Sequence, residues 1–144
     1  MTHTLTLTAD IQESDRSAIV AQVIDYNNSQ AGLGNGRALF VLLRDENNEV
    51  TGGLLGATGR GWLFVDHLVV PASLRGMGVG TEMMKAAEVE AITRGCDDAW
   101  LNTFEFQARG FYEKLGYTCF GELPNYPAGF SRFFMKKSLK ASTQ

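Results

Sequence analysis

The feature that most constrains this chain is a glycine-rich turn between an apolar run and a helical pattern. Residues 74–80 read LRGMGVG, which puts glycine at the alternate positions 76, 78 and 80. A buried strand over 62–70 is predicted before it by WLFVDHLVV, and an amphipathic helix over 81–95 is predicted after it by TEMMKAAEVEAITRG. The fold therefore includes a strand that passes into a helix through a turn with unusual backbone freedom.

The start of such a helix is suited to bind an anion. Its first N–H groups have no partner within the helix, and the positive end of the helix dipole lies there. Glycine lets a bulky phosphate approach the backbone, and Arg75 adds a positive charge. The turn predicts a pyrophosphate site, with the alternative that the glycines serve packing alone.

Two other phosphate-binding loops fit this turn poorly. A nucleoside-triphosphatase loop needs Gly-Lys-Ser/Thr, which does not follow here. A dinucleotide-binding fold has its glycine-rich turn after the first strand, whereas this turn follows the fourth predicted strand.

The remaining sequence alternates strand and helix patterns and predicts one domain over residues 1–144. A polar–apolar alternation predicts a first strand over 2–8, followed by a helix over 10–30 that leads into a loop rich in Asn and Gly. The further expected elements are strands over 37–45, 50–58, 99–104, 117–123 and 130–139, and a short helix over 107–116. This order predicts an α/β (α+β) domain with a central, mostly antiparallel mixed sheet flanked by helices.

Composition argues against several classes of partner. The net charge is −3 and the basic residues are scattered, so we expect no nucleic-acid partner. No apolar run is long enough for a membrane span and the N-terminus does not resemble a signal peptide, so a cytoplasmic protein is expected. Cys96 and Cys119 have no metal-binding spacing and are expected to be free, and no metal site is predicted.

Two motifs resemble those of one known family. RGMGVG resembles the Arg/Gln-x-x-Gly-x-Gly/Ala signature of the GNAT superfamily of N-acetyltransferases, with Arg75, Gly78 and Gly80 at the fixed positions. About thirty residues later, ARGFYEKLGY at 108–117 resembles the second family motif, Ala-x-x-Phe/Leu-Tyr-x-x-x-Gly-Phe/Tyr. The order of predicted elements also agrees over nearly the whole chain. The resemblance implies a GNAT-like fold whose fourth and fifth strands splay apart.

The resemblance further implies acetyl-coenzyme A (acetyl-CoA) as the acetyl donor. It assigns the pyrophosphate to the glycine-rich turn and the helix start, and the pantetheine arm to the main chain of the fourth strand. The residues so assigned are Leu68, Val69, Val70, Arg75, Gly76, Met77, Gly78, Val79, Gly80 and Thr81. Many family members have an Asn that bonds the CoA arm where this chain has Glu105, and Gln107 could supply an amide instead.

Tyr112 matches the family tyrosine that often protonates the leaving thiolate, with the alternative that it is an aromatic core residue. An attacking amine must also lose a proton, for which Asp66 and His67 are the candidates on the fourth strand and Glu105 is a third. Neighbouring strand residues point to opposite faces, so only one of Asp66 and His67 is expected to face the slot. The alternative for each is an ordinary packed or solvated polar residue.

In the family, the end of the first helix, the loop after it and the last hairpin usually select the acceptor. The residues expected there are Tyr26, Asn27, Asn28, Tyr126 and Phe130, and Glu105 is also a candidate. The expected function is acetyl transfer to a primary amine of an unidentified small molecule or peptide by direct attack. A non-catalytic acyl-CoA-binding or regulatory module and a toxin that acetylates charged tRNA are the alternatives. A homodimer formed through exposed final strands is an expectation of the family alone.

Overall fold

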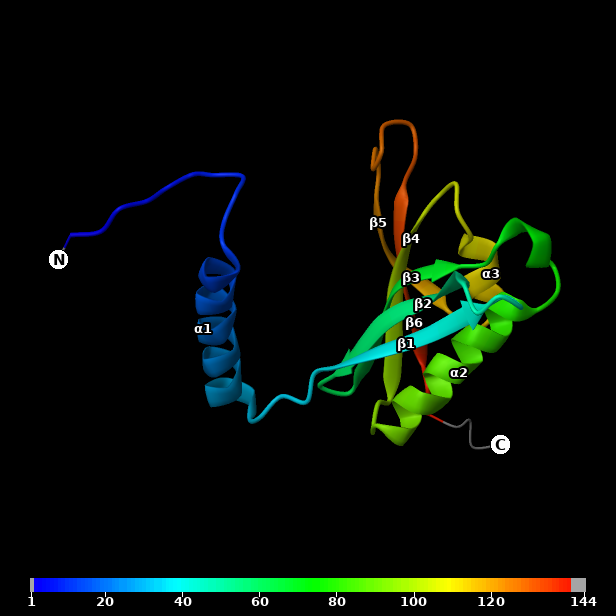
Figure 1. Cartoon of the computed structure of the whole chain (residues 1–144), viewed down its shortest axis with the longest axis horizontal. Helices are drawn as coiled ribbons and strands as arrows, with labels where there is room; N and C mark the ends of the chain where they lie inside the picture. Colours follow the sequence, from blue (N-terminus) through cyan, green and yellow to red (C-terminus); the bar gives the residue numbers. More distant parts are fainter. Residues whose placement is uncertain (1, 141–144) are drawn as a thin grey trace. The chain divides into compact units, whose positions relative to one another are not determined.

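The computed structural model describes residues 2–140, which fall into two compact units. One unit ends at Gly34 and the other begins at Asn35. Figure 1 labels the helices and strands of both. The expected single domain over the whole chain stays a prediction.

The N-terminal unit contains one helix, α1 (Glu13–Ala31). The Asp15 carboxylate accepts a hydrogen bond of 3.1 Å from the N–H of Gln12, and Gly32, with φ of +81°, follows the last turn. The strand predicted over 2–8 is wrong, because the described chain has no strand before β1. Alternation of side chains makes a strand only where a neighbouring strand accepts its backbone hydrogen bonds, and this unit contains none.

The second unit is built on a sheet of six strands in the order β1-β2-β3-β4-β6-β5. The strands are β1 (Arg37–Arg44), β2 (Val50–Gly59), β3 (Trp62–Val69), β4 (Asp98–Phe104), β5 (Thr118–Leu123) and β6 (Arg132–Ser138). Only β3 and β4 pair in parallel among the described strands, and all other neighbours are antiparallel. The predicted mixed, mostly antiparallel sheet is confirmed.

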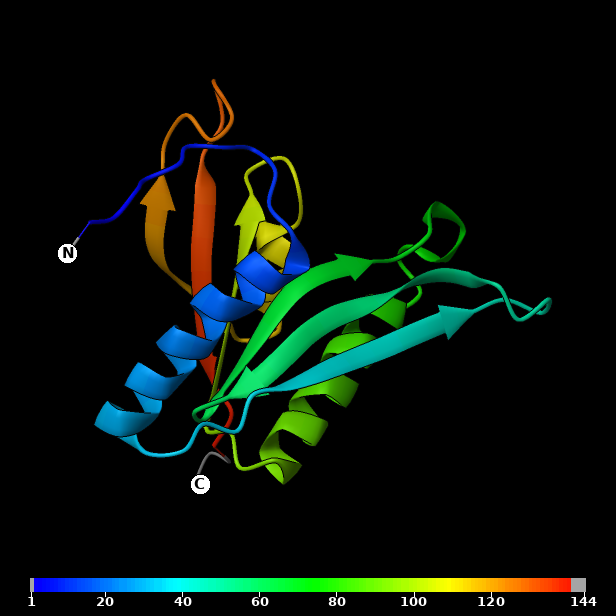
Figure 2. The same cartoon turned by 60° about the vertical axis from the view of Figure 1, so that its left-hand side comes forward.

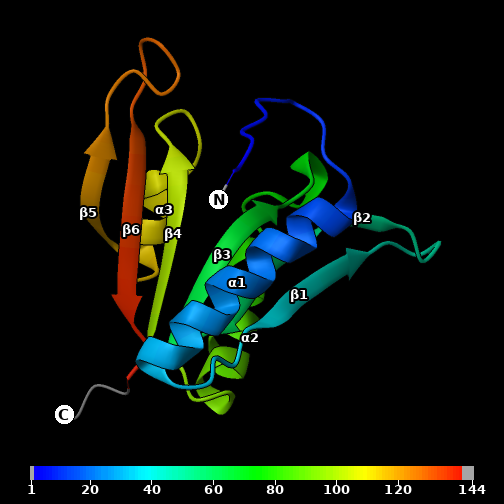
Figure 3. The same ribbon diagram turned by 90° about the vertical axis from the view of Figure 1, so that its left-hand side faces the viewer.

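The β3–β4 ladder is short. It joins Trp62 to Asp98 and ends with Val65 opposite Leu101, although both strands continue beyond these residues. Figure 3 shows the result: β1–β3 and β4–β6 meet near one end of the sheet and diverge toward the other. The expected splay between the two central strands is therefore present.

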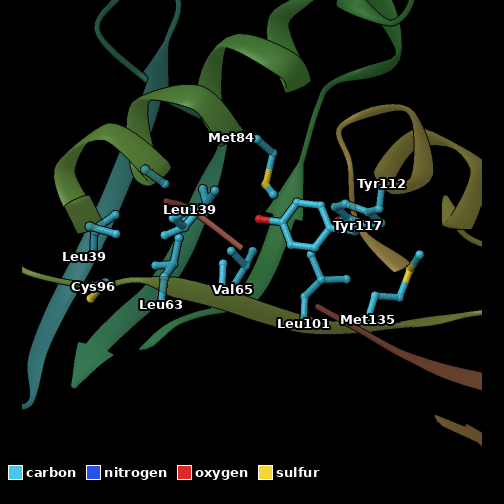
Figure 4. Packing of buried hydrophobic residues seen from close by; sticks show 14 of the residues in the cluster. Leu39, Leu63, Val65, Met84, Cys96, Leu101, Tyr112, Tyr117, Met135 and Leu139 are labelled. Atoms are coloured by element: carbon cyan, nitrogen blue, oxygen red, sulfur yellow. The ribbon is translucent and has the colours of Figure 1, made fainter. Parts of the chain in front are cut away.

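The helix α2 (Val79–Thr93) packs against β1, β2 and β3. It buries Met83, Met84, Ala87 and Ala91 along one face, as the spacing of these residues predicts. Gly95, with φ of +90°, follows the helix and bonds its N–H to the Ile92 carbonyl. Figure 4 shows Met84 above strand residues Leu63, Val65 and Leu101, with the rings of Tyr112 and Tyr117 at one end of the core.

A buried ionic cluster joins α2 to the far half of the sheet. Glu88 of α2 accepts a hydrogen bond of 2.8 Å from the Tyr117 hydroxyl, and its other carboxylate oxygen lies 2.8 Å from Nζ of Lys137 on β6. Tyr117 follows the short helix α3 (Arg109–Lys114) and is almost completely buried. Because every partner is satisfied, the cluster can sit at the edge of an apolar core.

Both cysteines are free: Cys96 is buried and Cys119 is half-buried. Across residues 2–140, no helix combines the length and the apolar character needed to cross a bilayer.

Candidate active site

A groove of about 820 Å³ opens where β3 and β4 diverge. It runs past the start of α2 at one side and past α3 at the other. The residues that line it are Asp66, His67, Leu68, Val69, Val70, Leu74, Arg75, Gly76, Gly78, Val79, Gly80, Thr81, Asn102, Thr103, Phe106, Gln107, Ala108, Phe111 and Tyr112. Most of the predicted donor-site residues are therefore brought together on one surface.

Gly76 and Gly78 give the glycine-rich turn its backbone shape. Their φ angles are +80° and +83°, in the left-handed region that favours glycine. Gly78 is the N-cap residue of α2, and its carbonyl accepts the first helical bond, from the N–H of Glu82 at 3.0 Å. The N–H groups of Val79, Gly80 and Thr81 come before this bond, so they are the donors that an anion at the helix start can use.

Gly80 serves close packing instead. A Cβ at this position would lie 3.1 Å from the Phe111 ring and 3.3 Å from a Val70 methyl. A Cβ at Gly76 or Gly78 would meet no atom within 4 Å. Packing thus explains Gly80, which brings α2 close to α3 and to Val70 just past β3, whereas Gly76 and Gly78 shape the turn. The pyrophosphate site at this turn stays a prediction.

Arg75 lies between the turn and the strand that precedes it. Its Nε donates a hydrogen bond of 3.4 Å to the Val70 carbonyl just beyond the end of β3. The side chain is exposed and lines the groove, so its charge stays available beside the helix start.

Asp66 occupies a bulge in β3. The ladder with β2 pairs His67 with Leu55 and Val65 with Gly56, so Asp66 has no partner residue on β2. The prediction that only one of Asp66 and His67 faces the slot is wrong, because the bulge interrupts the alternation and both residues line the groove. Their side chains approach each other, with Nδ1 of His67 3.4 Å from Oδ2 of Asp66.

Tyr112 lines the groove from α3 and is 8% exposed. Its ring makes edge contacts with Phe111 and Tyr117 at centroid distances of 5.1 and 6.1 Å. Burial raises the pKa of the Tyr112 phenol above its ordinary value of 10.0. The hydroxyl therefore keeps its proton at neutral pH and can donate it.

Gln107 shapes the loop between β4 and α3. Its Oε1 accepts hydrogen bonds from the Phe104 N–H at 2.7 Å and the Thr103 hydroxyl at 3.1 Å. Because its oxygen is bound within the loop, the Nε2 amide is the end of this side chain that can face a ligand in the groove.

Glu105 does not line the groove. Its Oε1 accepts a hydrogen bond of 2.8 Å from the Ser131 N–H, and its own N–H bonds the Ser131 carbonyl at 2.8 Å. The exposed Glu105 side chain thus ties the β4–α3 loop to the β5–β6 connection. This geometry does not support its prediction as a proton acceptor.

The comparisons with known proteins identify the family. A model described as the acetyltransferase (GNAT) family matches residues 7–117. The chain belongs to this family. It is 36% identical over 130 residues to acetyltransferase Atu2258 of Agrobacterium fabrum, covering 90% of this chain and 95% of that protein. It is also 39% identical over 95 residues to blasticidin-S acetyltransferase of Streptomyces morookaense, covering 65% of this chain and 70% of that one.

Solved acetyltransferase structures share the fold. A crystal structure of an Agrobacterium tumefaciens acetyltransferase matches with a TM-score of 0.86 and 36% identity, over 96% of this chain and 99% of that one. An aminoglycoside 6′-N-acetyltransferase complexed with coenzyme A matches with a TM-score of 0.63 over 92% and 97%, and its identity of 19% is evidence for the fold alone.

Some predicted site residues of this GNAT acetyltransferase lie outside the groove lining. Met77 belongs to the turn but is exposed and lines no part of the groove. Tyr126 and Phe130 lie in the β5–β6 connection, where Tyr126 contacts Phe104 at the end of β4 and Phe130 contacts Phe106 in the loop after it. Tyr26, Asn27 and Asn28 lie in α1 of the N-terminal unit, and their role in acceptor binding stays a prediction.

Sequence reasoning missed other lining residues of the GNAT groove, which are Leu74, Asn102, Thr103, Phe106, Ala108 and Phe111. Phe106 had a usable signal, because a second phenylalanine in FEF stands among polar residues just after a strand. Asn102 and Thr103 lie inside a strand pattern and carry no comparable signal.

Proposed function

We propose that this acetyltransferase transfers an acetyl group from acetyl-CoA to a primary amine of a small molecule or peptide. In this reaction the amine nitrogen attacks the thioester carbonyl, a C–N bond forms and the C–S bond breaks. The amine loses a proton and the CoA sulfur gains one. The observation that carries the proposal is the groove at the end of the β3–β4 ladder, which is lined by the start of α2 at one side and by Tyr112 at the other.

The groove fits both charged and peptide-like parts of CoA. The pyrophosphate would bind the N–H groups of Val79, Gly80 and Thr81, with Arg75 as the adjacent charge. Past Val65, the edge of β3 that faces β4 has no strand partner among the described residues. Its main chain at Leu68 and beyond is therefore open to the amide-bearing pantetheine arm, in the manner of an added strand. The CoA complex of a structural neighbour is consistent with this fit.

Tyr112 and the Asp66–His67 pair have separate roles in this proposal. Tyr112 donates its proton to the departing thiolate, for which its protonated state and its position in the groove are suitable. The Asp66–His67 pair accepts the proton of the amine, directly or through water. Main-chain N–H groups beside the gap between the strands polarise the thioester carbonyl.

The first acceptor to test is blasticidin S, because a relative of 39% identity is named for that activity. A panel should also contain an aminoglycoside, a polyamine, free amino acids and a peptide with a free N-terminus. Release of free thiol from acetyl-CoA, with mass analysis of the acetylated product, measures the reaction. If calorimetry shows CoA binding but no amine is acetylated, the proposed transferase activity fails and the non-catalytic module is favoured.

Substitution Tyr112→Phe tests the general acid. It should lower kcat about 100-fold, while CoA affinity changes less than about twofold because the pyrophosphate contacts remain. Tyr117→Phe is the matched control, since it also removes a buried phenol hydroxyl but one that bonds Glu88 outside the groove. A Tyr112→Phe enzyme with the wild-type kcat would refute the assigned role.

A further inference from the structure

Four aromatic rings form a cluster beside the groove. Phe104 and Phe106 come from the end of β4 and the loop after it, and Tyr126 and Phe130 come from the β5–β6 connection. Phe104 and Phe106 stack at 5.1 Å with an angle of 9° between their planes. Phe130 meets Phe106 at 5.1 Å and 74°, and Tyr126 meets Phe104 at 5.9 Å. Figures 2 and 3 show these two connections side by side at the open end of the sheet.

The cluster leaves much aromatic surface uncovered. Phe106 is 56% exposed, Tyr126 46% and Phe130 43%. The free energy falls when a phenylalanine ring leaves water. Several exposed rings in contact with one another therefore indicate a surface that receives a ligand. Phe106 also lines the groove itself. The cluster is therefore continuous with the space where the donor and acceptor would meet.

Arg132 limits which rings an acceptor can use. Its guanidinium lies 4.6 Å from the centre of Phe104 and 4.7 Å from that of Tyr126. Both Nε and Nη2 donate to Oδ1 of Asn102, which fixes the guanidinium there. A cation already covers Phe104 and Tyr126, so these two rings are not an empty cage for a positively charged acceptor group. The free aromatic surface next to the groove is that of Phe106 and Phe130.

The two loops that carry Phe106 and Phe130 are fixed to each other. Glu105 makes two contacts with the Ser131 main chain, one through its carboxylate and one through its N–H, and the Ser131 hydroxyl donates to Glu122 within the β5–β6 hairpin at 2.7 Å. Phe106 follows Glu105 directly, and Phe130 precedes Ser131 directly. The right-angled pair of rings is thus present before any ligand binds, which reduces the ordering cost of binding.

We propose that Phe106 and Phe130 form an acceptor subsite for a flat aromatic or heteroaromatic ring. This inference rests on the proposed acetyl transfer and adds the class of acceptor. The incoming ring continues the stack of Phe104 on Phe106, while Phe130 supplies an edge contact. The amine of the acceptor extends from that ring into the groove. A saturated ring of equal size has no flat aromatic face to stack on Phe106, so it binds less tightly between Phe106 and Phe130.

The test compares two amines of similar size, 2-phenylethylamine and 2-cyclohexylethylamine. Their binding to the CoA-loaded protein is measured by ligand-observed NMR, so that the result does not depend on turnover. We expect the aromatic amine to bind about 3- to 10-fold more tightly. Phe106→Leu should reduce this preference below about twofold, and Phe106→Tyr, which keeps the ring, should retain it.

Phe120→Leu is the matched control. Phe120 on β5 is 53% exposed, close to the value for Phe106, but it packs on Phe134 away from the cluster. Its substitution should leave the preference unchanged. Equal binding of both amines to the wild-type protein, or an equal loss of preference in Phe120→Leu, would overturn the subsite. Calorimetry with CoA alone separates a failure of the aromatic subsite from a failure of the proposed function. If the protein does not bind CoA, the proposed acetyl transfer is overturned. If it binds CoA but shows no preference for the aromatic amine, only the subsite is overturned.

Discussion

Gly78 and Gly80 are two residues apart and lack a side chain for different reasons. Gly78 adopts a left-handed backbone conformation in open space, while Gly80 has Phe111 and Val70 directly against its Cα. A substitution at Gly78 therefore changes what the helix start presents to a ligand without a clash with neighbouring atoms. Gly78 is therefore the better position at which to test the proposed pyrophosphate site at the start of α2.

Gly78→Glu should abolish measurable CoA binding, because it places a carboxylate at the helix start where phosphate is expected. Gly78→Ala is the matched control: both variants carry the backbone strain of about 1–2 kcal/mol for a side chain at positive φ, but only one adds charge. We expect Gly78→Ala to retain CoA binding within about tenfold, roughly 1.4 kcal/mol. Calorimetry measures both affinities, and thermal unfolding checks that both variants fold. Equal affinities of the two variants for CoA would contradict a pyrophosphate site at the start of α2.

At the scale of elements, α2 connects the glycine-rich turn at residues 74–80 to both halves of the sheet. Near its C-terminal end, the Arg94 guanidinium donates to the Ala38 carbonyl and the Thr58 hydroxyl, both at 3.0 Å. In its middle, Glu88 bonds Tyr117 and pairs with Lys137. These contacts fix the helix whose first turn is the proposed anion site.

Glu88→Ala should lower the free energy of unfolding by about 2–3 kcal/mol, because it leaves the Tyr117 hydroxyl and Lys137 without their shared partner. Glu113→Ala on α3 is the control. Glu113 pairs with Arg109 at 3.5 Å, and the two side chains are 51% and 38% exposed, so its loss should cost only about 0.5 kcal/mol. Denaturant titration measures both. Similar costs for the two variants would show that the Glu88 cluster contributes no more than a surface pair.

For the molecule as a whole, stability at alkaline pH depends on two buried phenols. Burial raises the pKa of Tyr112, and burial together with the neighbouring Glu88 raises that of Tyr117. Above pH 10, the ordinary pKa, each phenol ionises in the unfolded chain before it does so in the folded one. The unfolded state then binds fewer protons, so the folded state loses stability as pH rises.

Each of these phenols should contribute a decrease in the free energy of unfolding of up to about 1.4 kcal/mol per pH unit above about pH 10. Tyr117→Phe should make the combined decrease with pH shallower, although it also lowers stability at every pH by removing the bond to Glu88. Urea titrations at pH 8, 10, 10.5 and 11 measure the slope. A slope unchanged by the substitution would contradict the contribution of Tyr117.

The sequence predicted most elements because their signals are local. Glycine marks the turn before α2 and the end of α3, and apolar spacing marks the strands from β1 onward. The segment 2–8 has an equally regular alternation but no strand, since pairing depends on a partner that alternation does not report. The prediction that only one of Asp66 and His67 faces the slot failed for a related reason, because a bulge is a property of two paired strands.

The candidate site was predictable only on the donor side. The turn and Tyr112 belong to contiguous motifs, and the structure places both along the groove. The aromatic cluster depends on contacts between two loops about twenty residues apart, and no local pattern specifies these contacts. Glu105 resembled a free carboxylate in the sequence, yet its Oε1 accepts a main-chain hydrogen bond from Ser131.

The early end of the β3–β4 ladder has a consequence for how the sheet is protected from solvent. Amide protons exchange slowly where a neighbouring strand bonds them, and β3 beyond Val65 lacks that neighbour on one side within residues 2–140. If the donor arm bonds this edge, the protected sheet consists of protein and ligand together. The open edge would then report whether CoA is bound: those amides at 66–70 that point away from β2 gain protection when CoA binds and lose it when CoA leaves.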